Sequence, residues 1–272
     1  MLGKLTKYEF MATAKNFLPL YGAIIIISII NRIFVFSDLH FLRSTLNSSL
    51  IDVGQFFNFM LNMIFFAIII AIGVITLLVV IQRFYKNLYG DQGYLMHTLP
   101  VPKWELIASK VLVSVVWIIS SGFIIFVSIS ILVVNTDFIR ESFEMIKILI
   151  DEVGFSIIFE GLALAFAACI SSVLCIYAAI SLGNMFNSFK VLWSFGAYIA
   201  FALIESNIAF IGINVLDKVF DIFNKIFATD IEYLIMKTPH PLLLVLIAFE
   251  VVTAIAYFFV SHIIMSKKLN LQ

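Results

Sequence analysis

Long apolar blocks recur along this chain, and most of its charged residues fall in the shorter stretches between them. Each block reaches about 20 residues, the length that a helix needs to cross a hydrocarbon core of ~30 Å. Within the blocks, apolar residues follow one another without the regular polar positions of a helix at the surface of a water-soluble protein. The pattern predicts six transmembrane helices, at residues 17–36, 60–81, 111–134, 155–182, 191–213 and 242–265.

Composition supports a membrane protein over a soluble one. Hydrophobic residues make up 62% of the 272 positions and charged residues 12%, whereas soluble domains have about 45–50% and ~25%. The 17 basic and 17 acidic residues cancel, so no bulk positive field favours nucleic acid as a partner. We therefore expect an all-α, polytopic membrane protein that forms a single transmembrane domain over residues 1–272.

The distribution of lysine and arginine predicts the orientation in the membrane, because basic residues resist translocation. If the N-terminus is cytoplasmic, the inner connections hold ten basic residues and the outer connections seven. The ten are Lys4, Lys7, Lys15, Arg83, Lys86, Lys103, Lys110, Lys190, Lys267 and Lys268. This bias predicts a multi-pass protein of the cell (plasma) membrane with both termini in the cytoplasm.

Amphipathic stretches lie outside the predicted spans. Residues 1–16 are expected to form a short helix on the inner surface, which ends where Pro19 turns the chain into the membrane. The outer connections 135–154 and 214–240 each carry an apolar stripe at helical spacing, which predicts helices along the outer interface. Two interpretations stay open for these outer helices: simple anchoring, or covering an outward opening.

The longest cytoplasmic connection, residues 82–110, is called the connecting segment below. Gly90, Gly93, Pro100 and Pro102 divide it into short pieces. Aromatic and apolar residues are expected to form an exposed surface on it, and such a patch usually marks a binding site for a partner. They are Tyr85, Leu88, Tyr89, Tyr94, Leu95, Met96 and Leu99.

Part of the connecting segment, GDQGYLMHTLPVPKWELIASK, resembles the first cytoplasmic loop of ABC exporter permeases of the type-2 class. The matching positions are Gly90, Gly93, Leu95, Thr98, Leu99, Pro100, Val101, Leu106 and Lys110. The opening KYEF, the six spans and the short turn at residues 183–190 are similar to that family as well.

The resemblance implies a permease that dimerises with a second copy or a paralogue and docks onto a separate nucleotide-binding ATPase subunit. ATP and Mg would then be bound by that partner. The sequence itself is consistent with ATP binding on a partner, since the 272 residues contain no G-x-x-x-x-G-K-[ST] phosphate-binding loop. By resemblance, the ATPase contact falls on Tyr89, Gly90, Asp91, Gly93, Tyr94, Leu95, Thr98, Leu99 and Pro100.

Three glutamates lie inside predicted spans: Glu160, Glu205 and Glu250. A charge at the bilayer centre costs at least ~2.5–3.5 kcal/mol, so these groups are expected to face protein or water. One interpretation gives them a role in helix packing. The other makes them an acidic outer vestibule in the pathway of a cationic or amphipathic substrate, with Arg32 as a candidate counter-charge.

Neither catalytic nor metal-binding patterns stand out. Cys169 and Cys175 fall in one apolar block and are expected to be small core residues, and the four histidines have no partners at metal-ligand spacing. The favoured function is the membrane permease subunit of an ATP-driven exporter, not itself an enzyme, that moves an amphipathic, peptide-like or lipid-like substrate. A stand-alone secondary transporter or channel, and a non-transporting immunity or scaffold protein of the membrane, remain alternatives.

Overall fold

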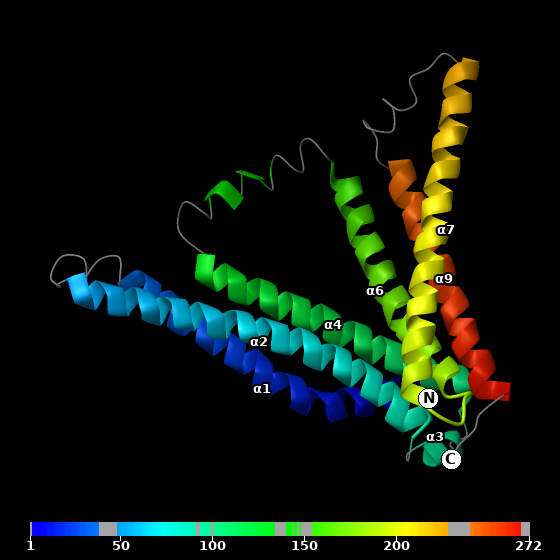
Figure 1. Ribbon diagram of the computed structural model, residues 1–272, viewed down its shortest axis with the longest axis horizontal. Coiled ribbons are helices and arrows are strands. Elements are labelled where there is room, and N and C mark those ends of the chain that lie inside the picture. Colours follow the sequence, from blue (N-terminus) through cyan, green and yellow to red (C-terminus); the bar gives the residue numbers. More distant parts are fainter. Residues whose placement is uncertain are drawn as a thin grey trace. The chain divides into compact units, whose positions relative to one another are not determined.

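The computed structural model describes residues 2–37, 48–90, 93–98, 101–133, 140–142, 144, 145, 147, 154–227 and 240–267. These residues form helices and no strand (Figure 1). The helices are α1 (Leu2–Ser37), α2 (Ser48–Leu88), α3 (Gly93–Thr98), α4 (Lys103–Val133), α6 (Phe155–Gly183), α7 (Lys190–Phe227) and α9 (His240–Lys267).

Six of these helices are long and apolar enough to cross a membrane. The apolar stretches are Leu2–Phe34, Phe56–Leu88, Lys103–Val133, Phe155–Gly183, Lys190–Gly212 and Leu242–Lys267. Each contains or closely overlaps one predicted span, so the all-α, multi-pass architecture is confirmed.

Several helices continue well beyond the predicted spans. α1 has 36 residues and α7 has 38, which at 1.5 Å per residue makes each about 55 Å long, more than the hydrocarbon core requires. No separate surface helix precedes Pro19, because α1 runs through this residue without a break. A proline removes one backbone hydrogen bond, and membrane helices tolerate that loss when neighbouring groups compensate.

The connections predicted to be outer are described only in part. The stretch expected to start a separate helix at residue 214 instead continues α7 as far as Phe227, and residues 228–239 lie outside the described residues. In the connection 135–154, Arg140 Nε lies 3.3 Å from Glu144 Oε1, one helical turn away. This pair agrees with the helical pattern expected there.

The chain forms two compact units. The first unit comprises Met1–Val80 and Leu112–Ile146, and the second comprises Ile81–Val111 and Lys147–Gln272. The first therefore holds α1 with most of α2 and α4, and the second holds α3, α6, α7 and α9 with the connecting segment.

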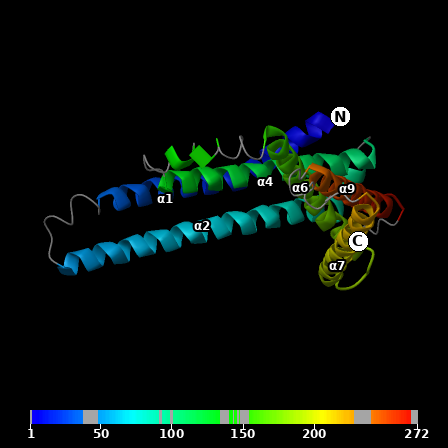
Figure 2. The same ribbon diagram turned by 90° about the horizontal axis from the view of Figure 1, so that it is seen from above.

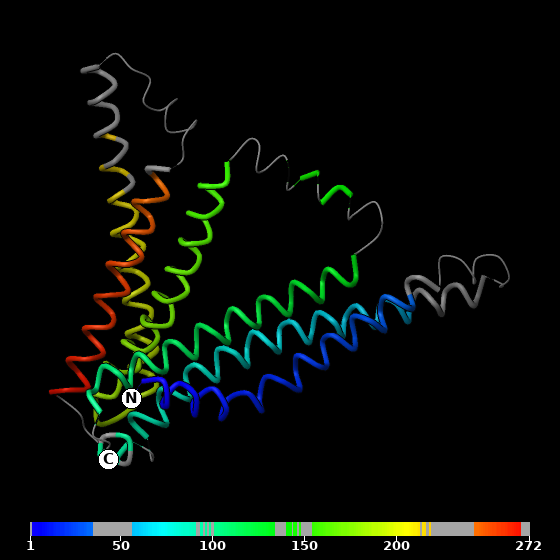
Figure 3. Tube along the Cα trace, turned by 180° about the vertical axis from the view of Figure 1, so that it is seen from behind, coloured from blue at the N-terminus to red at the C-terminus, as the bar shows by residue number. Residues whose placement is uncertain are grey.

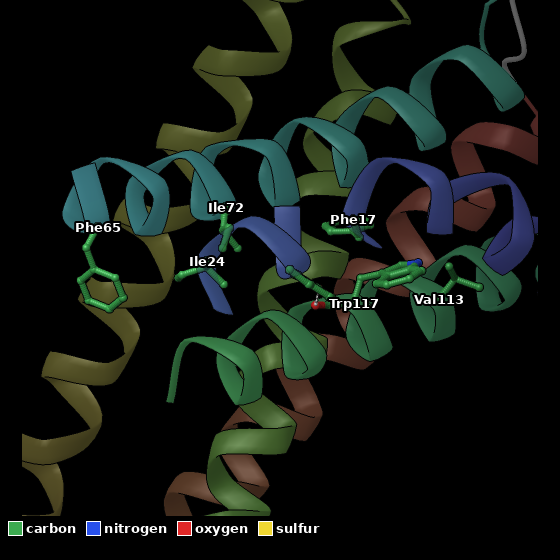
Figure 4. Packing of buried hydrophobic residues seen from close by; sticks show 7 residues of the cluster. Phe17, Ile24, Phe65, Ile72, Val113 and Trp117 are labelled. Atoms are coloured by element: carbon green, nitrogen blue, oxygen red, sulfur yellow. Dashed lines mark hydrogen bonds between the residues drawn. The ribbon is translucent and has the colours of Figure 1, made fainter. Parts of the chain in front are cut away.

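In the first unit, α1, α2 and α4 lie side by side around an aromatic core (Figures 1 and 2). Trp117 of α4 stacks on Phe17 of α1, with ring centroids 4.4 Å apart, and on Phe10 at 4.7 Å. Figure 4 shows this core from close by. Its buried members are Phe17, Tyr21, Ile24, Phe65, Ile72, Val113 and Trp117.

Polar side chains tie the same three helices together. Trp117 Nε1 donates to Thr13 Oγ1 at 2.7 Å. The hydroxyls of Tyr21 and Ser121 lie 2.7 Å apart, and Thr76 Oγ1 of α2 lies 3.1 Å from the same serine oxygen. Lipid is as apolar as the helices, so packing and such interhelical hydrogen bonds, worth about 0.6 kcal/mol on average, hold membrane helices together.

In the second unit, α6 packs against both α9 and α7 (Figure 3). The turn from α6 to α7 is tight at Gly183. A Cβ atom added there would overlap Ser194 Oγ and lie 2.5 Å from the backbone nitrogen of Ser194 and 2.7 Å from Lys190 O. Glycine therefore permits α7 to begin directly beside the end of α6.

Candidate functional site

The connecting segment is built from tight turns at its glycines and Pro102. α2 closes with two backbone bonds to Tyr85 O, from Tyr89 N and Gly90 N, both at 2.9 Å. A Cβ atom at Gly90 would lie 3.1 Å from Lys86 Cα, so a larger residue would crowd the last turn of α2. Gly93 N then donates to Gly90 O at 2.8 Å, at the point where α3 begins.

Both ends of the connecting segment are anchored to other helices of the second unit. At the α2 end, Phe84 stacks on Tyr177 of α6, with centroids 3.9 Å apart and planes 8° from parallel. Tyr89 Oη donates to Ser181 Oγ of α6 at 2.9 Å. At the α4 end, Lys103 Nζ donates to the carbonyl of Met265 in α9 at 3.0 Å.

Burial corrects part of the exposed patch expected from sequence. Leu88 is fully buried, and Tyr89, at 5% exposed, faces α6. Burial raises the pKa of Tyr89 to about 12, although the bond to Ser181 opposes this shift, so its hydroxyl remains a donor at neutral pH. The sequence did not reveal that Tyr89 is buried against α6. An aromatic residue at this position can equally well be exposed for contact with a partner, and the sequence pattern is the same in both cases.

Other residues of the connecting segment remain open to a partner. Tyr94 of α3 is 70% exposed, and Thr98 is exposed as well. Gly93 is buried. Asp91, Leu99 and Pro100, and the side chain of Leu95, lie outside the described residues.

Trp104 is a further exposed aromatic residue of the connecting segment. It lies in the first turn of α4, two residues after Pro102, and is 47% exposed. In the sequence it could have been noticed as an aromatic residue shortly after Leu99 and Pro100.

A second polar site lies among α6, α7 and α9 of the second unit. Tyr257 Oη of α9 donates to Glu205 Oε2 of α7 at 2.9 Å. Phe201 of α7 packs against the tyrosine ring, with centroids 5.2 Å apart. Glu205 therefore has a donor supplied by another helix.

Glu250 of α9 belongs to the same polar site. Thr253 Oγ1 donates to the backbone carbonyl of Glu250 at 2.9 Å, and the Ser171 hydroxyl of α6 lies 3.0 Å from Thr253 Oγ1. Glu205, through Tyr257, and Glu250 thus both lie at α9, about two helical turns apart. We call these two residues the glutamate pair.

Glu160 is not part of this pair. It lies on α6, 11 residues before Ser171, which corresponds to about 16 Å along the helix. It has interactions of its own within the chain. The structure thus brings together two of the three glutamates expected to share a vestibule.

Three further residues considered in the sequence analysis are Arg32, Cys169 and Cys175. Arg32 Nη1 donates to Leu132 O at 3.1 Å in the first unit, so pairing of Arg32 with a membrane glutamate stays a prediction. Cys169 and Cys175 are both free thiols.

Comparisons with protein-family models, with curated proteins and with solved structures give no match to this chain.

Proposed function

We propose that this chain is the membrane permease subunit of an ATP-driven exporter. ATP and Mg are bound on a separate nucleotide-binding subunit, which docks on the connecting segment. The observation that carries the proposal is the build of this segment: both of its ends are fixed to neighbouring helices, while Tyr94 between the anchors and Trp104 directly after Lys103 remain exposed. Its likeness to type-2 ABC permeases supports the same assignment.

This arrangement suits a mechanical link. α3 has six residues, too few for a stable isolated helix, so its position depends on the flanking anchors. Tyrosine and tryptophan are the residues that most often dominate binding energy at protein interfaces. An ATPase subunit bound to Tyr94 and Trp104 would transmit its movement to α2 and α4. The contacts of Phe84 and Tyr89 would pass this movement to α6, and the contact of Lys103 would pass it to α9.

The glutamate pair supports an amphipathic substrate, peptide-like or lipid-like, that carries positive charge. Paired carboxyls between membrane helices favour a cation over an anion of the same size. The basic inner connections support a protein of the cell membrane with both termini in the cytoplasm. A second permease copy or a paralogue completes the exporter in this proposal.

The test is co-purification of an ATPase subunit with the chain from its native cells. Tyr94→Glu should reduce the recovered ATPase about 30-fold or more, the loss expected when an interface anchor worth ~2 kcal/mol is removed. Tyr8→Glu is the matched control, because Tyr8 is also 70% exposed and lies outside the connecting segment.

Three outcomes separate the alternatives. Recovery of ATPase that Tyr94→Glu lowers and Tyr8→Glu does not supports the proposal. Transport by the purified chain in vesicles without any ATPase would replace it with a secondary transporter or channel. Absence of both transport and a co-purified ATPase would favour the scaffold or immunity function.

A further inference from the structure

An apolar groove lies between the first turns of α1 and the middle of α4, within the first unit. Its volume is about 400 Å³, and it is shallow and open along its length. The α1 residues that line it recur at spacings of three and four, so they share one helix face. The lining residues are Gly3, Thr6, Lys7, Phe10 and Met11 of α1 with Leu112, Val113 and Val116 of α4.

The floor of the groove presents hydrocarbon. Phe10, although it stacks on Trp117, keeps an exposed edge, and Met11, Leu112 and Val116 are exposed too. The one hydroxyl in the lining, that of Thr6, is used within α1, where it donates to Leu2 O at 3.2 Å. An extended acyl chain therefore fits this surface without leaving a polar group unsatisfied.

The rim of the groove is positively charged. Lys4 and Lys7 are both exposed on the first turns of α1, and Lys7 lines the groove itself. Glu9, the one acidic residue in the described part of α1, is 8% exposed and engaged within the chain, and Glu105 of α4, seven residues before Leu112, is partly buried and also engaged within the chain. An anionic group above the apolar floor would thus meet lysines and no exposed carboxylate.

We propose that this groove is a binding site for an anionic phospholipid, with an acyl chain along Leu112 and Val116 and the phosphate at Lys7. An ammonium group forms a charge-assisted hydrogen bond to a phosphate oxygen, and net negative charge adds a long-range attraction to the lysines. A zwitterionic lipid could fill the same groove but would lack that attraction. The site is independent of the proposed transport function.

The experiment uses the full chain in vesicles of phosphatidylcholine and phosphatidylglycerol, followed by mild detergent extraction and native mass spectrometry of lipids retained per chain. The wild type should retain phosphatidylglycerol in excess of its share in the vesicles. Lys7→Gln should lower this excess about fivefold, because one lysine near the surface contributes about 1 kcal/mol. Gly3→Leu should reduce retention of both lipids, since a side chain at Gly3 projects into open space at the groove.

Two controls match these variants. Lys15→Gln removes the same charge from the same helix but lies outside the groove lining, and Gly22→Leu adds the same side chain where a Cβ also has open space. Both should retain phosphatidylglycerol as the wild type does. Equal retention of the two lipids by the wild type, or equal losses in Lys7→Gln and Lys15→Gln, would overturn the site. If Gly3→Leu does not fold, the lysine comparison decides alone.

Discussion

At the scale of single residues, Gly183 has no room for a methyl group. An added Cβ would overlap Ser194 Oγ and approach backbone atoms of α7. Overpacking of this kind costs about 1–3 kcal/mol, so we expect Gly183→Ala to lower the thermal midpoint of the purified protein. Gly161→Ala is the control on the same helix, because its Cβ would meet open space. Equal midpoints for the two variants would show that the α6–α7 turn can relax.

The glutamate pair makes a second prediction at this scale. Glu205→Gln and Glu250→Gln each remove a charge while keeping the size and the hydrogen-bonding capacity of the side chain. If the pair attracts a cationic substrate, each variant should export it several-fold more slowly, because a neighbouring negative charge raises the local concentration of cations by tenfold or more. Glu160→Gln should export normally, since Glu160 lies apart on α6.

Transport assays in vesicles, with folding checked by the thermal midpoint, provide the measurement. Normal export by the Glu205→Gln, Glu250→Gln double variant would leave both residues with a packing role. A similar loss in Glu160→Gln would restore the three-residue vestibule expected from sequence.

At the scale of elements, the connecting segment depends on its anchors in α6. Phe84 is fully buried against Tyr177, and truncation of a buried phenylalanine costs about 3–5 kcal/mol in well-packed cores. We expect Phe84→Ala to retain the ATPase subunit, because Tyr94, Trp104 and the anchors at Tyr89 and Lys103 are unchanged, but to lose most ATP-driven transport. The ratio of transport to ATP hydrolysis in reconstituted vesicles measures this uncoupling.

Phe66→Ala is the matched control, since Phe66 lies on the same helix and is exposed. Its change in stability should stay within about 0.5 kcal/mol. An unchanged coupling ratio in Phe84→Ala would mean that the segment does not act through α6.

At the scale of the whole molecule, the predicted orientation can be tested by labelling. A cysteine at Ser142, in a connection predicted to be outer, should react with an impermeant thiol reagent added to intact cells. A cysteine at Ser188, in the exposed turn between α6 and α7, should react only after the cells are opened. The parent chain is the control, because Cys169 and Cys175 both lie within α6, a candidate span. The reverse pattern would invert the topology.

The sequence by itself determined the six spans, since a helix must be apolar over about 20 residues to cross the membrane, whatever it packs against. It also identified the connecting segment, because glycines, prolines and charges interrupt the apolar pattern there. It misjudged Pro19, which predicted a break, because helix continuation depends on what surrounds the missing hydrogen bond.

Only the tertiary structure decided which side chains meet. Tyr257 reaches Glu205 across 52 residues and Tyr89 reaches Ser181 across 92, while Glu160 stays apart from the glutamate pair. In a soluble protein, polar and apolar positions would have indicated which face of each helix turns inward. Here both lipid and the helix interfaces are apolar, so the pattern carries no such signal, and the packed faces follow from side-chain fit and interhelical hydrogen bonds.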